Sequence, residues 1–216
     1  STLSLLSVSI SQTLFPEVSD LSADKNYTRI RNLLQDGLAF TGLFGIPGLV
    51  GAALLGGELL SIYGSDFARG RWILVILIGA RLFSSYNSQL VNIINGIDRP
   101  DITFRINMLF LVTNLILNFG LVSIFGWYGA AVATMSSALI VLLVSNVALS
   151  RIIGQVPYPK RPILTQLLAA ILMGFIVEGS GSVLPSNTYF VLFRVFLGAA
   201  VYGIALFGIS DTFNQK

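Results

Sequence analysis

Long apolar runs, each about as long as a membrane is thick, constrain the fold of this chain more than any other feature. A hydrocarbon core of about 30 Å is crossed by about 20 apolar residues in a helix. About seven segments of the sequence qualify, the first of them in part, as if truncated. They are Thr2–Phe15, Leu38–Tyr63, Trp72–Asn95, Ile102–Phe125, Tyr128–Ser150, Ile163–Leu184 and Tyr189–Ile209. Strands of a transmembrane barrel are shorter and alternate in polarity, so the sequence predicts an all-α, polytopic transmembrane helix bundle.

The composition excludes several other classes of protein. Charged residues make up 11% of the chain, too few to coat a soluble domain, which carries about 25%. The chain has no Cys and no His, which removes disulfides, thiolate metal sites and the commonest metal ligand. We therefore predict no metal, no cofactor and no catalytic residue, and the net charge of +3 gives no reason to expect a nucleic-acid partner.

The distribution of basic residues predicts the orientation in a plasma membrane. Loops on one side of the bilayer hold most of the Lys and Arg, while the opposite loops hold only Arg69 and Arg71. The basic side comprises Lys25, Arg29, Arg31, Arg99, Arg105, Arg151, Lys160, Arg161 and Lys216. Because cytoplasmic loops carry the excess of positive charge, the C-terminus is predicted to be cytoplasmic.

The longest polar connection, Glu17–Asp36, is predicted to be a cytoplasmic linker within the lobe formed by residues 1–216. Its second half has the pattern of a short amphipathic helix. In one interpretation Ile30, Leu33 and Leu34 face the membrane, and in the other the helix is simply solvated.

One predicted span carries a row of polar side chains. Arg81 lies about nine residues from the start of this span, or about 13 Å deep at 1.5 Å per residue. Spacings of three and four put the row on one helical face. It consists of Arg81, Ser85, Ser88, Asn92 and Asn95. An arginine at mid-membrane costs about 2.5–3.5 kcal/mol, so Arg81 either lines a hydrated cavity and binds an anion or pairs with Glu58 or Glu178.

Other embedded polar residues also have two interpretations. Asn107, Asn114 and Asn118 share a face of the next span, where amides bind sugar hydroxyls or hold helices together. We expect helix packing for Asn118 and leave Asn114 open. Glu178 and Arg194 lie at similar depth on consecutive spans, so we expect an ion pair, with an outer gate as the alternative.

Several local patterns occur in an order that resembles a known family. They are Val8–Ser19, Gly45–Pro47, Glu58–Phe67, Asn95–Pro100, Asn114–Asn118 and Gly126–Thr134. Together they resemble the C-terminal half of a polysaccharide (O-antigen type) flippase of the multidrug/oligosaccharidyl-lipid/polysaccharide exporter superfamily.

The resemblance implies one lobe of a two-lobe transporter that works by alternating access. The partner would be an N-terminal lobe of the same chain, and the substrate would be a lipid-linked oligosaccharide on a polyprenyl phosphate carrier. Arg81 fits the cationic role in the substrate cavity, and Ser85, Ser88, Asn92 and Asn114 are further candidates for substrate contacts. The resemblance implies a transporter and not an enzyme.

Two alternatives remain open. One is a multidrug or small-molecule antiporter of the same fold, coupled to a cation. The other is a membrane enzyme similar to prenyltransferases, because Asp98 and Asp101 form a D-x-x-D pattern that could hold Mg²⁺. The second acidic cluster that such enzymes need is missing, so we expect Asp101 to cap the following helix instead.

Overall fold

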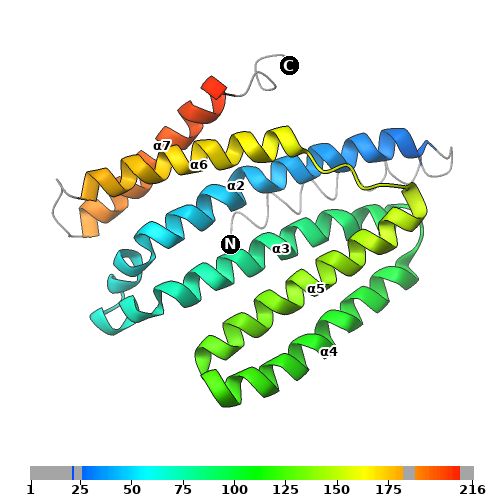
Figure 1. Cartoon of the computed structure of the whole chain (residues 1–216), viewed down its shortest axis with the longest axis horizontal. Coiled ribbons are helices and arrows are strands. Elements are labelled where there is room, and N and C mark those ends of the chain that lie inside the picture. Colours follow the sequence, from blue (N-terminus) through cyan, green and yellow to red (C-terminus); the bar gives the residue numbers. More distant parts are fainter. Residues whose placement is uncertain (1–20, 22–25, 182–187, 210–216) are drawn as a thin grey trace. The chain divides into compact units, whose positions relative to one another are not determined.

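The chain is predominantly helical in the part that the computed structural model describes, namely Leu21, residues 26–181 and residues 188–209 (Figure 1). No strand occurs in these ranges. The predicted first span, Thr2–Phe15, lies outside them. The elements are α2 (Tyr27–Ser61), the short 3₁₀ helix η1 (Ser65–Gly70), α3 (Arg71–Gly96), α4 (Pro100–Phe125), α5 (Trp127–Ile153), α6 (Lys160–Gly181) and α7 (Thr188–Ile209).

Five of the described helices are long and apolar enough to cross a membrane: α2, α4, α5, α6 and α7. This confirms the prediction of an all-α membrane bundle. The exception is α3, which has 26 residues and is therefore about 39 Å long at 1.5 Å per residue. It is long enough, but its row of polar side chains lowers its hydropathy. A helix of this kind needs protein or water along its polar face.

The first described helix, α2, is longer than the span predicted for it. It has 35 residues and continues through Pro47, so Tyr27–Asp36, which we had placed in a linker, forms its first turns. Ile30 and Leu34 are 0% and 2% exposed. The interpretation in which these two side chains face the membrane is therefore wrong, because they pack into the interior of the protein.

The chain divides into two compact units, which we describe separately. Unit 1 contains the described residues up to Thr41 together with Ala80–Pro159, and unit 2 contains Gly42–Gly79 together with the described residues from Lys160 onward. Both α2 and α3 contribute to each unit.

Unit 1 has an apolar core built from four helices. Nearly every side chain in it is less than 5% exposed, and the whole cluster is contiguous. Its members on these helices are Ile30, Leu34, Leu38, Leu90, Ile93, Ile94, Ile106, Val141, Leu149 and Ile153. The part of α3 in unit 1 thus buries the apolar face opposite its polar row.

A one-residue turn joins α4 and α5 within unit 1, as the Gly126–Gly129 pattern predicts. Gly126 has a φ of 57°, and its N–H donates to the Val122 carbonyl at 2.9 Å. Three residues later, Gly129 lies directly against the Leu121 carbonyl group. The two helices pack against each other, and their closest approach depends on a glycine.

The connection between α3 and α4 shows how the acidic D-x-x-D segment is used. Asp98 has a φ of 59°, and the N–H groups of Asp98 and Arg99 donate to the carbonyls of Asn95 (3.0 Å) and Ile94 (3.2 Å). These two bonds form a Schellman motif, in which the left-handed position usually holds glycine. The helix α4 starts at Pro100 with Arg99 as its N-cap. The expected capping role of Asp101 is therefore wrong: it lies in the first turn and pairs with Arg99 at 3.1 Å.

In unit 2, α6 and α7 pack against each other. A methyl group added at Gly198 would lie 3.1 Å from Val177 Cγ2, and one added at Gly174 would lie 3.4 Å from Leu54 Cδ1 on α2. These glycines let the helix backbones approach closely, as is typical of helix packing in membranes.

Candidate functional site

The polar row of α3 lies on the side of that helix that turns away from the core of unit 1. Arg81 and Ser88 are exposed, Ser85 and Asn92 are half-buried, and Leu90 on the opposite face is fully buried. Local helical geometry accounts for this arrangement, since residues three and four apart share a face.

The guanidinium of Arg81, the central residue of the predicted site, is exposed. It lies ten residues into α3, about 15 Å along the helix axis. No hydrogen bond or ion pair joins it to any residue of the described ranges. The pair that we considered for Arg81 with Glu58 or Glu178 is not formed, and both carboxylate oxygens of Glu58 bind Arg194 instead.

Some of the polar groups in the row on α3 already make bonds within the protein. The Ser88 hydroxyl donates to the Ser84 carbonyl at 2.9 Å, which leaves its oxygen free to accept a hydrogen bond. Asn95 Oδ1 accepts a hydrogen bond from the Thr103 hydroxyl at 2.6 Å. Asn95 thus ties α3 to α4, while the four predicted site residues of α3 lie closer to the middle of that helix.

The asparagines of α4 are joined to each other. Asn118 Nδ2 donates to the backbone carbonyl of Asn114 at 2.9 Å and to its side-chain oxygen at 3.0 Å. Both residues are half-buried, whereas Asn107 is exposed. Asn118 therefore orients the Asn114 amide, and the bond is within one helix and not between helices.

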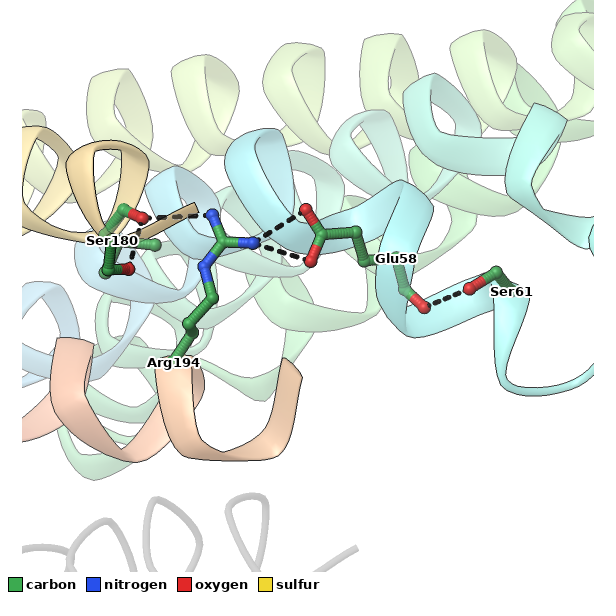
Figure 2. Close-up of polar contacts among 5 residues, drawn as sticks. Glu58, Ser61, Ser180 and Arg194 are labelled. Carbon is green, nitrogen blue, oxygen red and sulfur yellow. Dashed lines mark hydrogen bonds and ion pairs between the residues drawn. The ribbon is translucent and has the colours of Figure 1, made fainter. Parts of the chain in front are cut away.

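Arg194 makes a three-bond polar contact in unit 2 (Figure 2). Its Nη1 atom donates to Glu58 Oε1 and Oε2 at 2.8 and 2.7 Å, and its Nη2 atom donates to the Val177 carbonyl at 3.0 Å. Three helices, α2, α6 and α7, meet at this one side chain.

The expected partner of Arg194 was wrong. Val177 is 2% exposed and faces Arg194, and the next residue, Glu178, is turned by about 100° around the helix axis because an α-helix has 3.6 residues per turn. Glu178 is therefore exposed, and similar depth did not bring the two side chains together.

A second arginine contact, which is partly buried, was not predicted. Arg71, which we had treated as a loop charge, donates a hydrogen bond from Nη2 to the Ala53 carbonyl of α2, and its guanidinium carbon lies 5.3 Å from the centre of the Trp72 ring. The signal in the sequence is the Gly56–Gly57 pair, since both glycines leave room for the Arg71 side chain.

The fold, with five helices long and apolar enough to cross a membrane, defines a multi-pass membrane protein. The family model for "Lipid II flippase MurJ" matches residues 2–199. The chain belongs to this family, and the expected flippase resemblance is confirmed.

Individual relatives agree with the family. The chain is similar to "Probable flippase AglR" of Haloferax volcanii, with 34% identity over 98% of this chain and 45% of that protein. It is also similar to "Probable low-salt glycan biosynthesis flippase Agl15" of the same organism, with 26% identity over 92% of this chain and 42% of that protein. The chain thus spans less than half the length of these relatives.

A solved structure supports the fold. "Lipid II flippase MurJ, inward closed conformation" matches with a TM-score of 0.77 and 22% identity, over 94% of this chain and 42% of that one. At this identity the match establishes the helical arrangement and leaves the substrate open.

Proposed function

We propose that this chain is one lobe of a flippase that moves a lipid-linked oligosaccharide, carried on a polyprenyl phosphate, across the plasma membrane by alternating access. One relative is named as a probable flippase and another as a probable low-salt glycan biosynthesis flippase, and the second name supports this substrate class. In the proposed protein the second lobe is supplied by further residues of the same chain, and the C-terminus is cytoplasmic.

The observation that carries the proposal is the exposed guanidinium of Arg81 within the polar face of α3. Charged groups inside a membrane mark substrate and ion paths, and Arg81 has no hydrogen-bond or ion-pair partner among the described residues. A guanidinium offers five N–H donors in a fixed plane, which suits the oxygens of a phosphate. Arg81 would bind the (di)phosphate of the carrier, while Ser85, Ser88, Asn92 and Asn114 would contact phosphate or sugar oxygens.

The test uses the full-length protein with Arg81→Ala and Arg81→Lys. We expect Arg81→Ala to lower glycan export by at least about tenfold, the equivalent of losing one charge-assisted contact of about 1.5–3 kcal/mol. Lysine keeps the charge but loses the planar donor set, so Arg81→Lys should retain part of the export. Membrane abundance, measured by immunoblot, should remain unchanged in both variants.

Arg105→Ala is the matched control, because Arg105 is also an exposed arginine but lies in the first turns of α4. We expect this variant to export normally. Normal export by Arg81→Ala would remove Arg81 from the substrate site, and loss of the protein from the membrane would assign Arg81 a structural role. A parallel assay of drug efflux separates the flippase from an antiporter of the same fold.

A further inference from the structure

Arg194 is an almost fully buried cation whose neutralisation depends on one carboxylate. Its side chain is 9% exposed and that of Glu58 is 36% exposed. The remaining nitrogen, Nε, is buried and has no hydrogen-bond partner within the described ranges. Removal of Glu58 would therefore leave the guanidinium buried with only the Val177 carbonyl, and an unpaired buried charge is strongly destabilising.

The contact of α2 with α6 at Gly174 is apolar. Val50 and Leu54 of α2 lie against Gly174 of α6. Lipid tails are as apolar as these side chains, so such contacts give little net driving force for holding helices together in a membrane. The polar contact consequently carries a larger share of the attachment than it would in a soluble protein.

We propose that the Glu58–Arg194 pair fastens the α6–α7 pair of helices to α2, and that Gly181 provides the space the guanidinium needs to do so. This inference concerns the integrity of unit 2 and is independent of the proposed substrate. It also gives Glu58 and Arg194 a role other than substrate binding.

A substitution at Gly181 can show whether the Arg194 guanidinium is held in place or is free to move. A methyl group at this position would lie 2.6 Å from Arg194 Nη2 and 3.0 Å from Cζ. The far end of an unrestrained arginine would swing away from the methyl group at little cost. A guanidinium bound to Glu58 and Val177 cannot move without lengthening those bonds. The effect of Gly181→Ala therefore reports how firmly Arg194 is held.

The experiment is a double-mutant cycle on the full-length protein in detergent, with the thermal midpoint Tm as the readout. Gly181→Ala and Glu58→Gln should each lower Tm by roughly 5–10 °C. In the Glu58→Gln background, Gly181→Ala should have a much smaller effect, because the guanidinium is then free to move. Gly179→Ala is the control, since a methyl group there meets nothing within 4 Å, and it should not lower Tm.

Additive effects of the two substitutions would overturn the proposal, and so would a Gly181→Ala protein as stable as the Gly179→Ala protein. If Glu58→Gln does not yield folded protein, the comparison of Gly181→Ala with Gly179→Ala still decides whether the guanidinium is held.

A second measurement follows the attachment itself. The 216 residues contain no native cysteine. Cysteines introduced at Val50 and Gly174 can therefore be joined by a short thiol cross-linker, in a full-length protein from which any other cysteine has been removed. A methyl group at Gly174 would lie 3.5 Å from Val50 Cγ1. Glu58→Gln should lower the cross-linked fraction at least twofold. An unchanged fraction would mean that the apolar contacts hold the helices together without the ion pair.

Discussion

Replacing Gly129 by alanine should be among the most damaging small changes in unit 1. Gly129 lies in the first turn of α5, and an added methyl group would fall under 3.0 Å from three backbone atoms of Leu121 and Val122 in α4. Backbone atoms cannot rotate away as a side chain does. The two helices must therefore separate, although the one-residue turn at Gly126 holds their ends together.

The expected size of the effect follows from this geometry. Overpacking by one methyl group in a well-packed interior costs about 1–3 kcal/mol, and the rigid backbone contact places Gly129→Ala at the upper end. A loss of about 3 kcal/mol corresponds to a fall in Tm of roughly 6–12 °C for a protein of about 150–250 residues, and to a smaller fall for the longer full-length protein. Gly120→Ala is the matched control, since a methyl group there meets nothing within 4 Å. Alanine favours a helix over glycine by about 1 kcal/mol, so this variant should be at least as stable as the parent protein.

Both variants are measured as full-length protein in detergent, by thermal unfolding followed with intrinsic tryptophan fluorescence and by the fraction that elutes as a single species. Gly129→Ala is expected to lower Tm, whereas Gly120→Ala on the neighbouring helix is not. This difference would exclude a general effect of replacing glycine by alanine. Equal stability of the two variants would refute the close approach of α4 and α5 at Gly129.

Two further changes test the core and the loop of unit 1. Asp98→Gly should raise Tm by roughly 2–4 °C, because glycine adopts the left-handed conformation of the Schellman motif without the cost of about 1 kcal/mol that another residue carries there; a fall in Tm would indicate that the Asp98 carboxylate makes a needed contact. Leu90→Ala should destabilise by about 2–5 kcal/mol in denaturant titration, since Leu90 is 0% exposed. The same change at Leu115, which is 69% exposed, should cost far less, and similar losses would contradict the assignment of the core.

Helix positions were largely predictable because each boundary has a local cause. The span expected over Ile102–Phe125 is the helix Pro100–Phe125. Proline is well suited to the first turn of a helix, and the positive φ of Gly126 suits its end. The information needed for such a helix lies within its own residues and immediate neighbours.

The sequence predicts that a helix has an apolar face, but it does not predict whether lipid or protein covers that face. The spacing of Ile30 and Leu34 indicates one apolar helical face, and that face fits a membrane surface as well as a protein core. The structure shows that Leu90 and Ile94 of α3 belong to the same core. A contact between residues this distant in the sequence has no trace in the local pattern, so the membrane interpretation could not be rejected beforehand.

The two arginines within predicted spans show where sequence reasoning ends and what the structure adds. Arg81 and Arg194 carry the same charge at the same cost to a membrane protein, and each had an acidic residue at a suitable depth as a potential partner. Glu178 lies on a different side of α6 from the residue that contacts Arg194. The carboxylate that pairs with Arg194 belongs to Glu58, which is 136 positions away in the sequence. The pairing with Glu58 is therefore enough to explain why an arginine is tolerated at position 194. Arg81, which has no such partner among the described residues, keeps an exposed charge on a polar face, and binding of an anionic substrate would offset the cost of placing that charge in a membrane.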